Sequence, residues 1–329
     1  MNPNPKWIVF DLDQTIGCFD SIHPFLIVFF PDLLQYVYRR PHYKGELFPV
    51  LNISVENKKL LATAFSEFVK YATLDEKENR LLRPGIVHII ALLLQAKKKG
   101  LVKDMIIYSN NANRYNLYFA HEMLKLLLNV KEDIFSQLVD WWHPLRNAEA
   151  RPRMVKEPAL IATGPKTILT IRKAFGNMDI STEDIIFFDD SNHPHVKRQI
   201  PEKNYFNVQA YFSSGNLNNL HNAMLRALMA YDLDRNISLL DEYKKIGLHI
   251  GVTEEDIESF RMTNIRPTNV PTDFDEINGR LYEIFHMNAR AIIIPQTKIQ
   301  FRNINLKGGS FRKKRQTRKK ILKIRKTRK

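Results

Sequence analysis

The sequence predicts an α/β fold in three layers, with a parallel sheet between two layers of helices. Three short apolar runs without polar alternation predict strands that are covered on both faces. Helical patterns separate these runs, and such alternation of strand and helix is typical of a parallel sheet. Each run ends in polar residues. Because the carboxyl ends of parallel strands share one edge, where ligands bind, we expect these polar residues to form one site.

The first predicted strand, residues 7–10, leads into a turn that contains two carboxylates and a hydroxyl, Asp11, Asp13 and Thr15. Turns favour Asp for structural reasons, so this cluster taken alone has a purely structural alternative. The polar residues that follow the other predicted strands favour a site.

Residues 17–82 predict a small helical cap insertion beside the end of the first strand. Apolar residues recur at helical spacing over 25–38 and 58–71, and a segment with prolines and a glycine lies between them.

The second predicted strand, residues 105–108, ends in Ser109 and Asn110. A predicted helix over 82–100 precedes it, opened by Pro-Gly and closed by three lysines and a glycine. Another helix is expected over 112–128. Ser109 is interpreted as a site residue, and its structural alternative is a helix N-cap.

The third predicted strand, residues 185–188, ends in two adjacent acids, Asp189 and Asp190. Lys166 opens a short predicted helix before this strand and would bring an ammonium group to the same edge. Lys156 is the alternative for that role.

Other polar and aromatic residues near these strands receive structural interpretations. Trp141 and Trp142 are interpreted as core residues, and 207–212 as a fourth strand. His193 and His195 are interpreted as loop or helix-start residues rather than metal ligands, because no cysteine or second histidine pair accompanies them.

The basic charge of the chain is concentrated in a tail. The net charge is +15, and residues 307–329 contain thirteen Lys and Arg residues and no acid, so the preceding residues are nearly neutral. We expect a disordered tail that binds nucleic acid, an anionic membrane or an import receptor through its charge, or a solvated extension without a partner. Residues 216–306 predict a mainly helical C-terminal extension, with 292–294 as a candidate strand.

The predicted edge combines four carboxylates, a hydroxyl and an ammonium group. Crowded carboxylates repel one another, and a bound cation keeps them ionised. Oxygen ligands suit Mg²⁺, and a lysine and a hydroxyl opposite the ion suit the oxygens of a phosphate. These groups therefore predict phosphoryl transfer with Mg²⁺ as the cofactor.

The same residues resemble the four motifs of the haloacid dehalogenase-like (HAD) hydrolase superfamily. The motifs are D-x-D-x-T, a Ser or Thr after the second strand, a Lys, and a D-D pair. They correspond here to Asp11, Asp13 and Thr15, to Ser109, to Lys166, and to Asp189 and Asp190. The resemblance implies a Rossmann-like core over residues 1–215, with the insertion at 17–82 as its cap.

Within that superfamily, the fragment DIIFFDDSNHPHV resembles the magnesium-dependent phosphatases that carry an FFDD signature. The LRPG start of the helix before the second strand, and DLDQT in the first turn, resemble the CTD-type phosphoprotein phosphatases. The chain departs from the V-D-N-S run of the latter, because it has Phe188-Asp189-Asp190-Ser191-Asn192 there. The Gly-Gly-Ser hinge and basic tail look like the ends of some large DNA virus proteins.

The resemblance implies a mechanism in which Asp11 attacks phosphorus and forms an aspartyl-phosphate. Asp13 would protonate the leaving oxygen and then activate water. Asp11, the main-chain carbonyl of Asp13, and Asp190 would hold Mg²⁺, with Asp189 helping through water or exchanging roles with Asp190.

The remaining motif residues would bind the phosphate or support the turn. Ser109, Asn110 and Lys166 would contact phosphate oxygens, and Thr15 would support the turn after the first strand.

We therefore expect a Mg²⁺-dependent phosphomonoester hydrolase, acting on a phosphoprotein in the CTD-like case. Two alternatives remain open: a polynucleotide 3′-phosphatase held on its substrate by the tail, and a catalytically silent HAD-fold binding module. The chain shows no secretory signal, no apolar run long enough to span a membrane, and a single cysteine, Cys18. These features predict an intracellular protein, cytoplasmic or nuclear, in a virion or a host cell.

Overall fold

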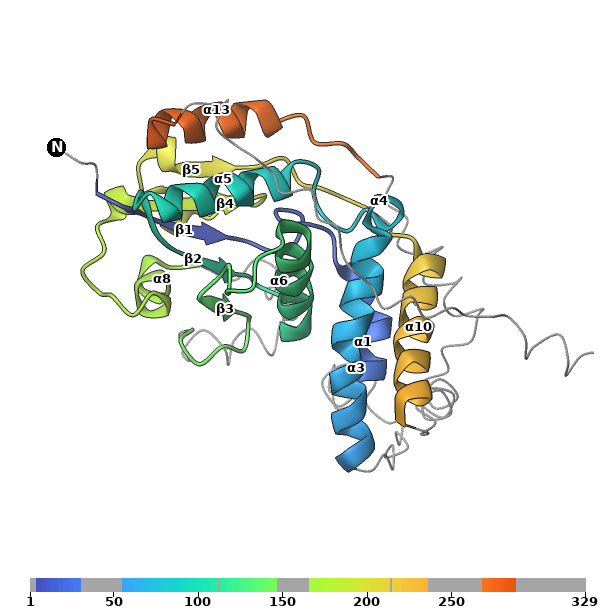
Figure 1. Cartoon of the computed structure of the whole chain (residues 1–329). Helices are drawn as coiled ribbons and strands as arrows, with labels where there is room; N and C mark the ends of the chain where they lie inside the picture. The colour runs from blue at the N-terminus through green and yellow to red at the C-terminus, as the bar shows by residue number, and fades with distance from the viewer. Residues whose placement is uncertain are drawn as a thin grey trace, which may run out of the picture. The chain divides into compact units, whose positions relative to one another are not determined.

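The computed structural model describes residues 4–30, 55–111, 113–146, 166–213, 215–235 and 268–287 (Figure 1). All of them lie in the first of two compact units, residues 1–297. Several predicted features lie outside the described residues: Lys156, the candidate strand 292–294 and the basic tail 307–329.

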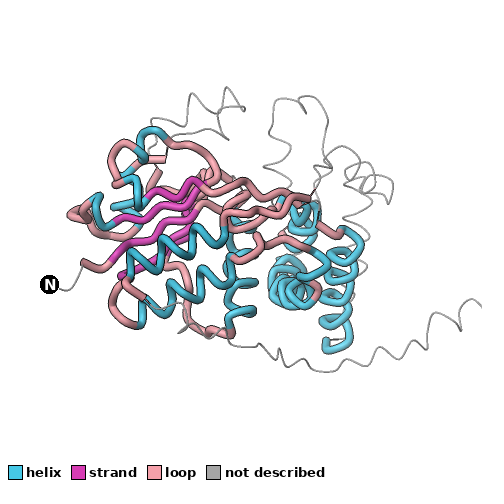
Figure 2. The backbone as a smooth tube through the Cα atoms, turned by 90° about the horizontal axis from the view of Figure 1, so that it is seen from above, coloured by secondary structure: helices cyan, strands magenta, loops and turns pink. Residues whose placement is uncertain are grey.

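A five-stranded parallel sheet forms the centre of the fold. Its order is β3 (Gln137–Val139), β2 (Val102–Tyr108), β1 (Lys6–Phe10), β4 (Ile185–Asp189) and β5 (Tyr205–Asn207). Figure 2 shows the strands side by side, with helices on both sides of the sheet. The prediction of a three-layer α/β, Rossmann-like fold with a parallel sheet is confirmed.

The strand register aligns the ends of the three central strands. Phe10, the last residue of β1, pairs with Ile107 of β2 and with Phe188 of β4. The backbone N–H of Asp11 donates to the carbonyl of Phe188 at 2.8 Å, which extends the pairing by one residue. The residues that follow β1, β2 and β4 therefore leave the sheet along one edge.

The strand side chains alternate between two hydrophobic clusters, one on each face of the sheet. Ile8 and Phe10 face the cluster that contains apolar residues of α5 (Ile86–Lys98), α6 (Arg114–Leu128) and α13 (Phe274–Phe285). The opposite face packs against the short helices α8 (Ile168–Ala174) and α9 (Pro194–Lys197). Burial on both faces explains why the strands read as continuous apolar runs.

Four further helices belong to the first cluster or lie next to it. They are α1 (His23–Phe29), α3 (Val55–Leu74), α4 (Glu76–Asn79) and α10 (Leu217–Arg235). Helix α3 packs against α1, α6 and α10, and Figure 1 shows α1, α3 and α10 alongside one another. Helix α10 comes from the predicted C-terminal extension, and α1 and α3 come from the predicted insertion. The extension therefore packs against the insertion.

The sheet differs from the predicted strands at two places. The short edge strand β3 was not predicted. The fourth strand was predicted over 207–212, whereas β5 ends at residue 207. After β5 the backbone leaves the sheet, because Tyr211 N–H donates to the carbonyl of Gln14 and Phe212 N–H donates to the side chain of Asn269. The chain there binds the turn after β1 instead of a neighbouring strand.

In the part of the chain that the structure describes, no helix combines the length and the apolar character needed to cross a bilayer.

Candidate functional site

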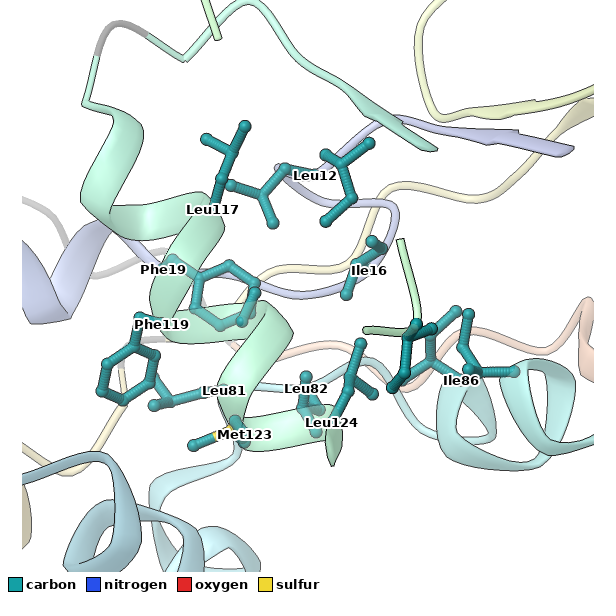
Figure 3. Close-up of a cluster of buried hydrophobic side chains, with 14 of the residues drawn as sticks. Leu12, Ile16, Phe19, Leu81, Leu82, Ile86, Leu117, Phe119, Met123 and Leu124 are labelled. Carbon is teal, nitrogen blue, oxygen red and sulfur yellow. The ribbon is translucent and has the colours of Figure 1, made fainter. Parts of the chain in front are cut away.

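The turn after β1 alternates buried apolar side chains with polar ones. Leu12 and Ile16 are fully buried and belong to the hydrophobic cluster in Figure 3, together with residues of α6 and of the segment before α5. The polar residues Asp11, Asp13, Gln14 and Thr15 lie next to these two apolar residues in sequence. The two apolar anchors fix the backbone, and this fixes where the polar side chains begin.

Gly17 closes this turn at a place where no side chain fits. Its backbone forms bridges with Asp13 and with Leu82, and its carbonyl accepts from Gln14 N–H at 2.6 Å. A Cβ atom at Gly17 would lie 2.3 Å from the carbonyl oxygen of Leu81. Gln14 has a φ of 63°, so the turn also contains a non-glycine residue in the left-handed region.

A buried lysine joins two of the predicted acids. Lys166 Nζ lies 2.5 Å from Asp11 Oδ1 and 2.5 Å from Asp189 Oδ2. Its side chain is 1% exposed, and it stands between the rings of Tyr108 and Phe187. The structure thus brings Lys166 to the ends of β1 and β4, as the sequence predicted for the motif lysine.

Asp189 is held by several donors. Oδ1 accepts from the backbone N–H of Ser191 at 2.8 Å, and Oδ2 lies 3.2 Å from His193 Nε2 as well as next to Lys166. His193 precedes helix α9 as its N-cap residue, which agrees with its interpretation as a helix-start residue. The contact of His193 with Asp189 was not predicted, although only three residues separate the two in sequence.

The buried charges at this edge have shifted pKa values. Burial raises the pKa of Asp11 to about 7, although the charge of Lys166 opposes this, and the charge of Asp189 adds to it. Burial would also raise the pKa of Asp189, but Lys166 and His193 outweigh it and hold that pKa below its usual value. Burial would lower the pKa of Lys166, and the charges of Asp11 and Asp189 instead raise it. Lys166 is therefore a fixed cation at neutral pH.

Asp190 lies beside Thr15. The Thr15 hydroxyl donates to Asp190 Oδ1 at 3.3 Å and accepts from Asp190 N–H at 2.9 Å. Thr15 is 1% exposed, so its hydroxyl joins the turn after β1 to the end of β4. Burial raises the pKa of Asp190, and the charge of Asp189 is the next largest cause of this rise.

Ser109 and its neighbours form the part of the site that follows β2. Ser109 is buried, and its Oγ accepts from the backbone N–H of Asn111 at 3.0 Å. The amide of Asn111 donates to both carboxylate oxygens of Asp13, at 3.2 and 3.0 Å. Asn111 was not predicted as a site residue, although it follows Ser109 and Asn110 directly. It orients the carboxylate of Asp13.

Arg146 is a second residue that the sequence analysis missed. Its guanidinium donates to the carbonyl of Ser109 at 2.7 Å and to Asn110 Oδ1 at 2.6 Å, and it lies over the rings of Tyr108 and Trp141. Because Asn110 Oδ1 accepts from Arg146, its NH₂ group is the half of the amide that would donate to an anion. No spacing in the sequence connects Arg146 with Ser109.

The two tryptophans differ in their environments. Trp141 is buried, as predicted for a core residue, and its backbone N–H donates to the carbonyl of Asn111. Trp142 is 42% exposed and is therefore not a core residue.

Three of the predicted metal ligands gather in space. Carboxylate oxygens of Asp11, Asp189 and Asp190 lie within 4.8 Å of one another, so these side chains could hold a metal ion. Asp13 was assigned to the ion through its main-chain carbonyl, and that assignment stays a prediction.

A second group with the ligand types of a metal site contains His121, Glu122 and Asp133. Its His121 Nε2 accepts from the backbone N–H of Ile134 at 3.1 Å, so the ring nitrogen nearest the acids is already engaged.

No protein-family model, no curated protein and no solved structure matches this chain. The resemblance to the HAD superfamily therefore remains an expectation that rests on the motif residues themselves.

Proposed function

We propose that this protein is a Mg²⁺-dependent phosphomonoester hydrolase of the HAD type that acts through an aspartyl-phosphate. The observation that carries the proposal is the buried ammonium group of Lys166 between Asp11 and Asp189, with Asp190 alongside, at the carboxyl edge of a parallel sheet. A cation and several carboxylates held close together suit a phosphate with its metal ion better than an uncharged substrate.

The donor set fits a hard divalent cation, because it consists of carboxylate oxygens. Asp189 is less available than its neighbours, since both of its oxygens accept from protein donors. Asp11 and Asp190 are therefore the side chains that would hold the ion. When bound, Mg²⁺ would neutralise part of the charge on the phosphate and on the carboxylates.

Asp11 is suited to be the nucleophile. One of its carboxylate oxygens would attack phosphorus, the bond from phosphorus to the ester oxygen would break, and an aspartyl-phosphate would form. The fixed charge of Lys166 favours the ionised form of Asp11, which burial alone would disfavour. Lys166 would then also lie next to the oxygens of the transferred group.

Asp13 is suited to move the proton. It would donate a proton to the departing ester oxygen, and in the second step take a proton from the water that attacks the aspartyl-phosphate. The two hydrogen bonds from Asn111 hold its carboxylate in one orientation. Ser109 and Asn110, held by Arg146, would donate to the remaining phosphate oxygens.

The test of this mechanism is the variant Asp11→Asn, which keeps an oxygen for Lys166 but removes the nucleophile. We expect turnover of an aryl phosphate in Mg²⁺ to fall by at least about 10³-fold. Asp179→Asn, which removes an exposed carboxylate, is the matched control and should keep full turnover. Acid-quenched wild-type protein should carry a phosphoryl group on Asp11, detected by peptide mass spectrometry. Wild-type turnover in Asp11→Asn would overturn the mechanism.

The substrate class is tested separately. A phosphopeptide and a 3′-phosphorylated oligonucleotide should be compared as substrates, each with the full chain and with a chain that lacks residues 307–329. Preference for the peptide would support the phosphoprotein case. Preference for the oligonucleotide that depends on the tail would support the polynucleotide alternative, and inactivity on every ester would support the silent binding module.

A further inference from the structure

A partly buried ion pair connects the C-terminal segment 268–287 to the turn after β1. Arg83 precedes α5 and Asp273 precedes α13, and their side chains are 2% and 18% exposed. Arg83 donates to Asp273 Oδ1 and to the carbonyl of Gln209. It also lies 3.5 Å from the carbonyl oxygen of Gln14, and its own backbone N–H donates to the carbonyl of Ile16 at 2.9 Å.

The same contacts fix the strip of chain after β5. Asp273 Oδ2 accepts from the backbone N–H of Gln209 at 2.7 Å, so both backbone groups of Gln209 bind the ion pair. Two residues later, Tyr211 N–H donates to the carbonyl of Gln14 at 2.9 Å. The carbonyl of Gln14 is therefore held directly by this strip and by Arg83.

Gln14 needs such support. Its φ of 63° lies in the left-handed region, which a residue with a side chain adopts at a cost and keeps only where its surroundings fix it. Gln14 directly follows Asp13, and its carbonyl belongs to the peptide that leads on to Thr15. Anchoring this carbonyl fixes the backbone torsions of Gln14 and thereby where the side chain of Asp13 begins. Asn111 holds the far end of that side chain.

The geometry points to Arg83 and Asp273 as positioning residues for the proton-transferring carboxylate of Asp13. This inference rests on the proposed function. The side chains of Arg83 and Asp273 bind each other and the backbone of Gln14 and Gln209. The pair acts through the Gln14 carbonyl, and so a segment more than 250 residues along the chain from Asp13 is part of the catalytic apparatus.

A displaced proton donor has a characteristic kinetic effect. An aryl phosphate with an electron-poor leaving group departs without much protonation, whereas an alkyl phosphate needs a proton on its leaving oxygen. Displacement of Asp13 should therefore slow the alkyl ester more than the aryl ester. A general loss of folded protein would slow both equally.

The experiment measures kcat/KM, which reports the step that releases the leaving group, for both esters with the full chain in Mg²⁺. Asp273→Asn keeps an acceptor for Gln209 N–H but places an amide next to Arg83, and Arg83→Lys keeps the charge but loses the fork. We expect each variant to raise the ratio of aryl to alkyl turnover by roughly 10-fold or more, in the direction that Asp13→Asn gives. Asp275→Asn, which removes an exposed charge from the same helix, should leave the ratio unchanged.

The outcomes separate this inference from the proposed function. If wild type hydrolyses both esters and depends on Asp11, but both variants keep the wild-type ratio while folded by circular dichroism, the positioning role is overturned. If wild type hydrolyses neither ester, the proposed function fails first. Should Asp273→Asn not fold, Arg83→Lys alone decides, since it retains the buried cation.

Discussion

Lys166 Nζ lies 2.5 Å from Asp11 Oδ1, and both groups are buried at the end of the central strand. The two residues are far apart in sequence, and a helix start and a strand end bring them together. The ammonium group also touches Asp189, so one cation balances two carboxylates that are largely buried.

Replacement of Lys166 by Met should destabilise the protein, because Asp11 and Asp189 would stay buried without their cation. Removal of one partner from a buried ion pair costs about 3–5 kcal/mol, and we expect a loss of that size at pH 7 in a chelator. Lys173→Met, which replaces an exposed lysine of the helix α8 that follows Lys166, should stay within about 0.5 kcal/mol of wild type. Urea unfolding measures both.

The same variant has an expected pH dependence. The pKa of Asp189 is lowered in the folded protein, because Lys166 and His193 outweigh burial, so its stabilising contribution is present above its unfolded pKa of about 3.9 and is lost as the pH falls further. The difference between wild type and Lys166→Met should therefore shrink below about pH 4. A difference that stayed constant with pH would contradict this.

Glu76 should make the protein less stable as the pH rises. Its Oε1 accepts from Leu82 N–H at 2.7 Å, while the buried Oε2 has no hydrogen-bond partner among the described residues. Burial raises the pKa of Glu76 from 4.5 to about 8, so the folded state binds a proton that the unfolded state releases, and stability falls between these values.

Glu76→Gln keeps the acceptor for Leu82 and removes the ionisation. We expect the variant to unfold at higher urea concentration than wild type at pH 7, by on the order of 3 kcal/mol, and to match wild type at pH 4. Glu78→Gln, at an exposed position of the same helix, should follow the wild-type pH profile. An unchanged profile in Glu76→Gln would show that the burial of Glu76 has no such effect.

Replacement of glycine by alanine should lower stability at Gly17 and raise it at Gly279. Gly17→Ala would place a Cβ 2.3 Å from the carbonyl of Leu81, so the turn that carries Asp13 must move, and we expect lower stability and at least about 10²-fold lower turnover. Gly279→Ala lies in α13 with nothing within 4 Å of the new Cβ, and it should stabilise the protein by about 0.5–1 kcal/mol without loss of turnover. Thermal unfolding and an aryl phosphate assay check both. Normal turnover in Gly17→Ala would disprove the close fit of the turn.

A divalent ion should stabilise the folded protein through Asp11 and Asp190. At 100 times its Kd, Mg²⁺ would add about 2.7 kcal/mol, seen as a rise in Tm. Asp190→Asn keeps an oxygen for the Thr15 hydroxyl but weakens the ion site, so its rise in Tm at the same concentration should be less than half of that. Asp179→Asn should respond like wild type, and an equal response of all three proteins would place the ion elsewhere, with the group around His121 as the next candidate.

The sheet core and the main polar groups were predictable because their signals are local. Fully buried strands read as apolar runs, and a parallel sheet brings the ends of such runs together. This is why Asp11, Lys166 and Asp189 meet although they are distant in sequence.

The missed elements depend on distant contacts. β3 has only three residues and forms by pairing with β2 at the sheet edge. β5 ends early because the chain after it bonds to Gln14 and to Asn269. Helix α13 lies within the predicted helical extension and also carries a local signal, since Ile277, Leu281 and Phe285 recur at a spacing of four and are buried.

The supporting residues of the site were predictable to different degrees. Asn111 follows Ser109 by two residues and could have been included with it. Arg146 and the pair Arg83 and Asp273 bind backbone carbonyls or each other across long stretches of sequence, and such contacts leave no periodic pattern.

The central position of β1 has a consequence for synthesis on the ribosome. β1 precedes β4 in sequence and pairs with it on one side, so a nascent chain that ends before β4 carries the proposed nucleophile on a strand with one unpaired edge. Such edges promote association with other chains. The strand that carries the proposed nucleophile is thus completed only after β4 has been made, and we expect a chain that stops before β4 to be inactive and prone to aggregate.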